Sequence, residues 1–415
     1  MVSAARKKKN RINHRINLKT RKQQAWEQLP ESFIAKCRTK VPFTEPEGIE
    51  DGSKEEKRSM DFFSAPTLPH FNPEWISKPY SFSDQYSIHA TLGRYNLCRS
   101  FRNPKTLLIF RTVMKGWHES GCIVAMKKFH VPPEDILQLE EVRALSSINH
   151  ENVVKLLSLR LTVSVQYLVL EYCHFDLEVL IHLPKVKIET EHIKSIAFAL
   201  LSGLTAIHKK NYAHRNLRPS HVLLTQDGVV KITDFGLSCS TEAASPISTS
   251  QMENIHYAAP ESLLGCTEIR RNADLWSVGV IIGELFLRAS LFDAKNNRNQ
   301  VVHLLELLGD FEGTFFEGNQ NYQEIRSAWS GDKNGTFHKV FEPRLCNGSL
   351  YDGEGLRFVK NMMKTNIDHR LTVEEALNHE WFKSGVRGNV KDLLEIFKNP
   401  CRSRIFQDSN DDSND

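Results

Sequence analysis

The distribution of hydrophobic residues divides the chain into an extension, a globular region and a tail. Residues 1–85 show little hydrophobic periodicity, carry an acidic patch at 45–57 and are interrupted by prolines, a pattern typical of a largely disordered extension. Residues 86–386 have the pattern of a globular domain. Residues 387–415 end in an acidic stretch rich in serine and asparagine, and we interpret them as a C-terminal tail.

Two kinds of periodicity follow one another within the globular region. Short apolar runs predict strands at residues 106–114, 122–129 and 166–170. Longer segments with apolar residues at helical spacing predict helices at residues 134–147, 190–209 and 274–287. The chain therefore places its β-like runs before most of its helical ones.

The composition is that of a soluble globular protein, with 40% hydrophobic and 25% charged residues among 415. The longest apolar run, residues 278–287, includes Glu284 and is shorter than the roughly 18 residues that a membrane-spanning helix needs. We therefore expect no membrane association. The basic start is followed by polar sequence, which argues against secretion. Eight cysteines without a C-x-x-C pair indicate free thiols in the nucleus or cytoplasm, with no zinc or disulfide framework.

The net charge of +4 conceals an uneven distribution. Residues 1–22 hold nine Lys/Arg before the first acid, Glu27, which leaves 45 basic against 50 acidic residues in the rest of the chain. A basic block of this kind is consistent with a nuclear address or an arm that binds nucleic acid. A solvated tail without a specific partner and a transit peptide are the alternatives. Nucleic-acid binding is expected only through residues 1–22.

Several short motifs that carry chemistry occur in a fixed order. Lys127 lies in the strand-like run Val-Ala-Met-Lys, and Glu141 follows fourteen residues later in a helical pattern that points it back at this strand. The later motifs are Tyr167-Leu-Val-Leu-Glu171-Tyr-Cys173, His214-Arg-Asn216-Leu-Arg218-Pro-Ser-His221, Asp234-Phe-Gly, Ala259-Pro-Glu261, Asp274-Leu-Trp-Ser-Val-Gly and Arg370 in Asp-His-Arg-Leu-Thr. Each tripeptide alone is weak evidence.

Taken together, in this order and at these separations over about 300 residues, the motifs resemble those of the eukaryotic protein kinases. The resemblance implies an α+β, bilobal fold with a small β-rich N-lobe (86–171) and a larger helical C-lobe (174–386). The C-lobe resembles the cyclin-dependent and MAP-kinase (CMGC) group in the hinge sequence after Glu171, in residues 261–265 and in residues 301–309. Ala258 stands where that group has an arginine.

The resemblance assigns a nucleotide site to named residues. Lys127, held by Glu141, would grip the α- and β-phosphates of ATP, and Asp234 would hold Mg²⁺. The remaining positions that match the family's cofactor-binding residues are Gly93 in the phosphate loop, Ala125 and Leu223 around the adenine, and Glu171 and Cys173 in the hinge.

Three positions of the catalytic loop depart from the family pattern. Asn216 stands where the catalytic aspartate is expected, and an amide oxygen cannot take the proton of a substrate hydroxyl. His221 replaces the asparagine that would be the second magnesium ligand, although imidazole suits this hard cation poorly. Arg218 replaces the loop lysine and keeps the charge without its compact geometry. The phosphate loop around Gly93 retains one glycine where three are usual.

These departures favour a catalytically impaired kinase, a pseudokinase, over an active one. We expect a regulatory or scaffolding module that binds protein partners, kinases or substrates, and that retains at most weak binding of ATP and Mg²⁺. The alternative is a slow Ser/Thr protein kinase. The residues that support the fold resemble those of working kinases: Leu145, Leu156, His214 and Phe235 can form the regulatory stack, and Glu261 can pair with Arg370.

Overall fold

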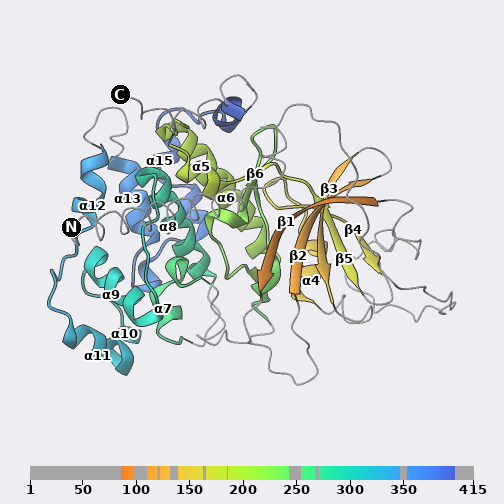
Figure 1. Cartoon of the computed structure of the whole chain (residues 1–415). Coiled ribbons are helices and arrows are strands. Elements are labelled where there is room, and N and C mark those ends of the chain that lie inside the picture. The colour runs from red at the N-terminus through yellow and green to blue at the C-terminus, as the bar shows by residue number, and fades with distance from the viewer. Residues whose placement is uncertain are drawn as a thin grey trace, which may run out of the picture.

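The computed structural model describes residues 86–96, 110–118, 122–130, 139–161, 165–184, 186–242, 254–266, 271–345 and 353–397. These residues form a smaller lobe built on a β-sheet and a larger lobe built of helices, which lie side by side in Figure 1. The division matches the α+β architecture expected from the sequence.

The smaller lobe is a five-stranded antiparallel sheet in the order β1-β2-β3-β5-β4. Its strands are β1 (Tyr86–Asn96), β2 (Phe110–His118), β3 (Ile123–Phe129), β4 (Leu156–Leu161) and β5 (Gln166–Glu171). In the centre, Lys127 of β3 stands opposite Val113 of β2 and Leu168 of β5. The sheet therefore holds this lysine from both sides. The short helix α4 (Glu140–Ser147) reaches across to the larger lobe, where it contacts the 3₁₀ turn η4 (Phe235–Leu237).

Two of the predicted strands are confirmed, and the third differs at its end. The runs 122–129 and 166–170 correspond to β3 and β5. The predicted strand 106–114 corresponds to β2 (Phe110–His118), which continues beyond the predicted end, while residues 106–109 lie outside the described residues. The apolar run ends before Lys115, but pairing with β3 continues to Trp117, opposite Ile123. Register with a neighbouring strand, and not the apolar run alone, therefore sets where this strand ends.

The larger lobe contains the remaining helices. They are α5 (Leu177–His182), α6 (Thr190–Lys209), α7 (Pro260–Leu263), α8 (Asn272–Leu287), α9 (Asn297–Leu308), α10 (Thr314–Gly318), α11 (Gln320–Ala328), α12 (Phe337–Leu345), α13 (Gly353–Met362), α14 (Val373–Leu377) and α15 (Glu380–Lys383), with the 3₁₀ turns η3 (Pro219–His221), η6 (Ile255–Tyr257), η7 (Ile367–His369) and η8 (Val390–Phe397). The predicted helices 190–209 and 274–287 are confirmed as α6 and α8. The predicted helix 134–147 is described only from Leu139 onward, and its observed part is α4.

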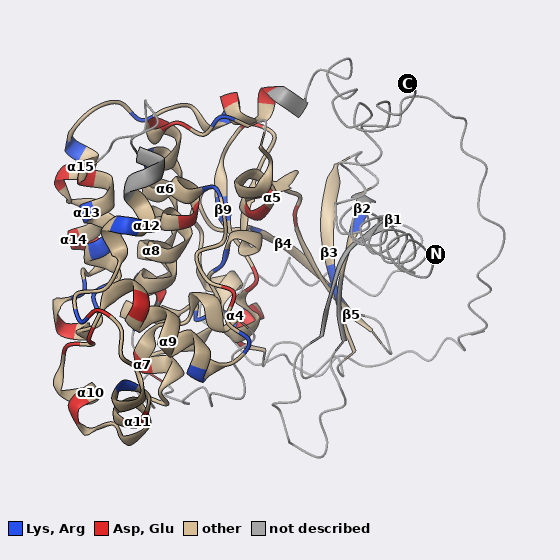
Figure 2. Cartoon of the chain, turned by 60° about the vertical axis from the view of Figure 1, so that its left-hand side comes forward, with Lys and Arg blue, Asp and Glu red and all other residues tan. Residues whose placement is uncertain are grey.

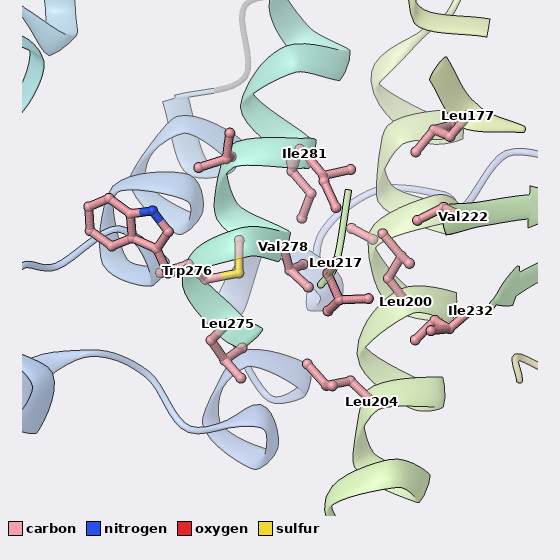
Figure 3. Close-up of a cluster of buried hydrophobic side chains, with 14 of the residues drawn as sticks. Leu177, Leu200, Leu204, Leu217, Val222, Ile232, Leu275, Trp276, Val278 and Ile281 are labelled. Carbon is pink, nitrogen blue, oxygen red and sulfur yellow. The ribbon is translucent and has the colours of Figure 1, made fainter. Parts of the chain in front are cut away.

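Helices α6 and α8 form the centre of this lobe. Every residue of α8 from Asp274 to Leu287 is buried, which is expected for a helix whose apolar residues leave no polar face. Figure 3 shows Leu200 and Leu204 of α6 facing Val278 and Ile281 of α8 across a continuous apolar cluster. Gly279 and Gly283 let α8 approach its neighbours closely, since a Cβ on Gly279 would lie 2.9 Å from the Met363 side chain.

Two small sheets hold the ends of the loops that carry residues 214–221 and Asp234. The strands β6 (Phe175–Asp176), β8 (Val222–Leu224) and β9 (Val230–Ile232) form one sheet in the order β6-β8-β9, and β7 (Tyr212–Ala213) pairs with β10 (Cys239–Ser240). Residues 214–221 run from β7 to β8, and Asp234 follows β9. The fold thus fixes both ends of the catalytic loop and brings Asp234 alongside it.

Acidic and basic residues are interspersed over the outer helices in Figure 2. The basic block of residues 1–22 and the rest of the extension to residue 85 lie outside the described residues. None of the helices among the described residues has the length and apolarity needed to cross a membrane. The C-terminal segment 387–397 contacts the first turn of α6. The N–H of Gly388 donates to the carbonyl of Glu191 at 2.9 Å.

Candidate nucleotide site and catalytic loop

Lys127 joins the two lobes through two carboxylates. Its Nζ lies 2.5 Å from Oε1 of Glu141 in α4 and 2.6 Å from Oδ1 of Asp234 beyond β9. Lys127 and Glu141 are 3% and 2% exposed, and a buried charge is tolerated only when it is paired and hydrogen-bonded. The structure therefore brings together the three charged residues that the sequence placed in one site, with two carboxylates sharing one ammonium group.

Asp234 occupies a strained backbone conformation. Its φ of 62° and ψ of 71° lie in the left-handed region, which is costly for a residue with a Cβ and persists only where the surroundings fix it. Besides the contact with Lys127, its Oδ2 lies 3.2 Å from Nε2 of His221. One oxygen of the carboxylate thus pairs with the sheet lobe, and the other faces the imidazole of the catalytic loop.

Asp274, at the start of α8, anchors the catalytic loop from below. Its two oxygens accept hydrogen bonds from the backbone N–H of His214 at 2.9 Å and of Arg215 at 2.7 Å, and Oδ2 also contacts Nε2 of His208 at 2.9 Å. Burial acts to raise the pKa of Asp274, but these hydrogen bonds outweigh it and hold the pKa below its usual value. Arg215, with φ of 63°, is held in its left-handed conformation by this anchor.

The regulatory stack proposed from the sequence is buried as a unit. Leu145, Leu156, His214 and Phe235 are each at most 3% exposed. The rings of His214 and Phe235 meet edge to face with centroids 4.9 Å apart. Farther down the larger lobe, Arg370 donates two hydrogen bonds to the carboxylate of Glu261, at 2.7 and 2.9 Å. The structural residues of the site are therefore in place.

His221 lies among the polar residues of the site and contacts Asn216, Arg218 and Asp234. It is 1% exposed, and burial, reinforced by Arg218 and opposed by Asp234, lowers its pKa to about 4. The ring is therefore neutral at physiological pH. Nδ1 lies 2.7 Å from the carbonyl oxygen of Asn216 and is assigned as the protonated nitrogen, because it has this acceptor. Nε2 then accepts a hydrogen bond from Nε of Arg218 at 3.2 Å.

Asn216 lies in the buried turn of the loop and is 6% exposed. Its backbone N–H donates to Nδ1 of His214 at 3.3 Å, and its carbonyl accepts the bond from His221. Residues 214–221 contain no Asp or Glu. The altered positions Asn216, Arg218 and His221 therefore lie together, and the loop offers no carboxylate at the place where the resemblance expects a general base.

The residues assigned to the adenine and the hinge lie on strands of both lobes and on the segment that connects them. Ala125 of β3 stands opposite Leu170 of β5, and Leu223 lies in β8. The carboxylate of Glu171 accepts from the backbone N–H of Lys155 and pairs with Lys231 at 2.8 Å. Its side chain is thus engaged with the protein, so a nucleotide would meet the backbone of the hinge. Burial, with Glu171 nearby, raises the pKa of the Cys173 thiol to about 12.

Gly93 lies within β1, opposite Val113 of β2, at an irregularity in the strand register. Residues 97–109, which connect β1 to β2 and include Cys98, lie outside the described residues. The closing turn of the phosphate loop is therefore not placed, and the assignment of Gly93 to phosphate binding stays a prediction.

Sequence reasoning missed Asp176, which lies beside this site. Its Oδ1 accepts from the N–H of Val179 at 2.8 Å and caps α5, and burial, partly offset by this bond, raises its pKa to about 6. The signal was present, because aspartate directly before an apolar helical stretch is a common N-cap. The contact between His221 and Asp234 was also missed, since no sequence pattern gives the direction of a side chain in a loop.

Comparison with known proteins places this geometry in a family. Residues 110–382 match the model of the family described as the protein kinase domain. The matched segment begins at the first residue of β2. The chain is 30% identical over 302 residues to "Cell division control protein 2 homolog 3" of Trypanosoma brucei brucei, covering 71% of this chain and 93% of the relative. It is 32% identical over 273 residues to "Serine/threonine-protein kinase crk1" of Schizosaccharomyces pombe, covering 64% and 78%.

Solved structures share the fold. The structure described as the yeast RNA Pol II CTD kinase CTDK-1 complex superposes with a TM-score of 0.61 at 24% identity, covering 67% of this chain and 92% of that one. The bilobal α+β fold expected from the sequence is thereby confirmed, and the two relatives agree with the resemblance of the C-lobe to the CMGC group.

Proposed function

The chain belongs to the protein kinase family, and within it we propose that this protein is a catalytically impaired member that acts as a regulatory or scaffolding module with weak nucleotide binding. Protein kinase domains in general bind ATP and Mg²⁺ and transfer the γ-phosphate to a hydroxyl group. The proposal concerns how far this chain keeps each of these abilities. The observation that carries it is the loop 214–221.

Asn216 accounts for the loss of phosphotransfer in this proposal. An asparagine amide holds no site that can take a proton at neutral pH and no negative charge to orient a hydroxyl. Loss of a general base costs roughly 10²–10⁴ in rate. Asp234 does not substitute for it, because its two oxygens are already in contact with Lys127 and His221.

The residues at the metal position do not suit Mg²⁺. This ion prefers oxygen ligands in octahedral geometry, whereas the second position beside Asp234 holds the imidazole of His221, 3.2 Å from its carboxylate. Arg218 adds a positive charge at the same imidazole. In this proposal Mg²⁺ therefore takes no part in phosphate transfer at this loop.

ATP retains part of its site. Ala125 and Leu223 supply apolar contact, residues 171–173 supply backbone groups, and Lys127 supplies the cation. To reach a phosphate, Lys127 must give up its contact with Asp234, which weakens binding. We expect ATP and ADP to bind with similar dissociation constants, roughly in the tens to hundreds of micromolar, and with little help from Mg²⁺.

The binding-module role rests on the contrast between the altered loop and the complete scaffold around it. The anchor at Asp274, the Glu261–Arg370 pair and the apolar core of α6 and α8 keep a kinase-shaped surface. Such a surface can bind partner kinases or their substrates without chemistry. Nuclear targeting, or contact with nucleic acid, is proposed for residues 1–22 alone, from their nine basic side chains.

A radiolabel transfer assay tests the proposal. We expect the wild-type protein to transfer no more phosphate from ATP, to itself or to a basic protein, than the Lys127→Met variant. The double variant Asn216→Asp, His221→Asn restores both altered loop positions and is expected to gain activity relative to wild type. Transfer by the wild type that disappears in Lys127→Met would contradict the proposal.

The second candidate function is a slow Ser/Thr protein kinase. It is favoured by the ion pair of Lys127 with Glu141, which phosphotransfer by kinases requires, and by a relative whose name is a serine/threonine-protein kinase. The same assay separates the two functions, since a slow kinase loses its residual transfer when Lys127 is replaced.

A further inference from the structure

Residues 387–395, which we call the C-terminal strap, are attached to α6 through their backbone. The N–H of Gly388 donates to the carbonyl of Glu191 at 2.9 Å, and the carbonyl of Gly388 accepts from Oγ of Ser195 at 2.6 Å. Both partners lie in the first two turns of α6. The strap therefore has a fixed position on this helix.

Apolar side chains of the strap are part of the core of the larger lobe. Val390, Leu393 and Leu394 are 7%, 4% and 2% exposed. They belong to the same apolar cluster as the buried residues of α6 and α8. The segment that the sequence analysis treats as the start of a tail thus contributes three anchors to the packed lobe.

The strap also contacts the turn between β8 and β9. Gly228 in this turn has a φ of 81°, and a Cβ there would lie 2.4 Å from the backbone nitrogen of Lys391. Glycine is the residue that allows both this conformation and this close approach. Nζ of Lys391 also pairs with Oδ1 of Asp227 at 3.0 Å. The strap and the turn therefore meet backbone to backbone.

The hairpin of β8 and β9 carries two residues of the candidate site at its open end. β8 begins directly after His221, and β9 ends two residues before Asp234. The N–H of Thr233 donates to the carbonyl of His221 at 3.0 Å, which extends the pairing of the two strands toward the site. Because a two-stranded hairpin is only marginally stable by itself, its geometry depends on the segments that pack against it.

We propose that the C-terminal strap is a positioning element for the candidate nucleotide site. By holding the closed end of the hairpin, the strap keeps β8 and β9 in register, and this register sets His221 beside Asp234 at the open end. Release of the strap loosens this pair before the core of α6 and α8 opens. The role applies whether the site transfers phosphate, binds nucleotide or does neither.

Hydrogen–deuterium exchange of the full chain, resolved by residue, tests the proposal at the N–H of Thr233. Leu394→Ala removes an anchor of the strap, and we expect it to speed this exchange by about tenfold. Leu305→Ala, at a similarly buried leucine of α9, is the matched control and should leave the Thr233 rate within about twofold of the wild type. Leu394→Met refills the space and should restore slow exchange.

A second pair of variants tests the same link from the hairpin. Gly228→Ala places a Cβ against the backbone of the strap, whereas a Cβ on Gly265, which has a φ of 87°, meets nothing within 4 Å. Both substitutions put an alanine in the left-handed region and carry its strain. Only Gly228→Ala should speed the exchange of Thr233.

Two outcomes would overturn the proposal. One is an unchanged Thr233 rate in Leu394→Ala and Gly228→Ala. The other is equal acceleration in these variants and in their controls, because Thr233 would then exchange only through unfolding of the whole lobe. The amides of residues 278–282 in α8 report that global unfolding in the same samples. Exchange of Thr233 that is faster than theirs, and that is accelerated by Leu394→Ala and Gly228→Ala alone, would support the positioning role.

Discussion

Two carboxylates in the larger lobe, the buried Asp274 and the half-buried Asp234, have opposite surroundings. Asp274 accepts hydrogen bonds from two backbone N–H groups and contacts His208, so its charge is fully supported. Asp234 lies in a left-handed backbone conformation, with one oxygen on Lys127 and the other on the neutral ring of His221. The first carboxylate supports the fold, and the second lies among the residues of the candidate nucleotide site. Their difference teaches that the residues which support a kinase fold and the residues proposed for phosphate transfer meet separate requirements.

The largest expected effect concerns the other supported acid, Glu261. Arg370 donates to both of its oxygens and to the carbonyls of Lys364 and Asn272. Arg370→Met leaves the carboxylate buried and uncompensated, and we expect a loss of about 3–5 kcal/mol in the free energy of unfolding. Urea unfolding measures it. Lys383→Met, which breaks the exposed pair with Glu380, is the control and should have little effect on stability, because solvent screens exposed ion pairs.

A smaller loss is expected for Asp274→Asn. The amide has one acceptor oxygen, so at least one of the backbone N–H groups of His214 and Arg215 loses its partner, at a cost of about 1–3 kcal/mol. The pKa of Asp274 is lowered in the folded protein. Its stabilisation is therefore complete above the unfolded pKa and is lost as the pH falls through the lower folded pKa. Urea unfolding at pH 7 and in acid should show this component in the wild type and not in the variant.

Asp227→Asn is the matched control for that measurement, because Asp227 is an exposed acid paired with Lys391. Its effect on the free energy of unfolding should stay below about 1 kcal/mol at either pH. If Asp274→Asn lowers the free energy of unfolding no more than Asp227→Asn does, Asp274 does not anchor the catalytic loop, and the contrast with Asp234 is wrong.

Asp176 accepts one backbone hydrogen bond, but burial still raises its pKa. Its replacement should have the smallest effect on the free energy of unfolding, and it should increase stability. Burial raises its pKa to about 6 from 3.8, so the charged form opposes folding above pH 6 and the opposition disappears as the pH falls toward 4. Asp176→Asn keeps an acceptor for the N–H of Val179. We expect it to stabilise the fold by about 1–2 kcal/mol at pH 7 and to be neutral near pH 4.

Thermal unfolding across this pH range measures the effect of Asp176→Asn. Glu306→Gln, at an exposed acid of α9, should leave the pH dependence as in the wild type. A variant that is less stable than the wild type at pH 7 would show that the charge of Asp176 is needed, and it would move this residue to the group of supporting acids.

Structure was predicted best from the sequence where a residue lies in a regular helix or strand, because the spacing of apolar residues reveals such elements. Helix α6 and helix α8 follow from long apolar periodicity, and the approach of Glu141 to Lys127 follows from a helix placed beside a strand. Prediction failed where pairing decides the outcome, because β2 continues past its apolar run to keep register with β3.

The candidate site divides in the same way. Asn216, Arg218 and His221 were identified as altered by their place in a motif, and this required no geometry. The hydrogen bonds that connect them were not predictable, because the direction of the His221 ring depends on the carbonyl of Asn216 and on the strained backbone of Asp234. A loop without periodicity gives no signal for either.

Helix α8 has a consequence for the order in which this protein opens. A helix that is buried on all sides exposes its amides to solvent only when the elements packed around it separate. The N–H groups of residues 278–282, at the centre of the buried segment, should therefore exchange with solvent deuterium only through unfolding of the entire larger lobe. Because the catalytic loop is tied to Asp274 at the start of the same helix, the altered loop is attached to the slowest-opening part of the molecule.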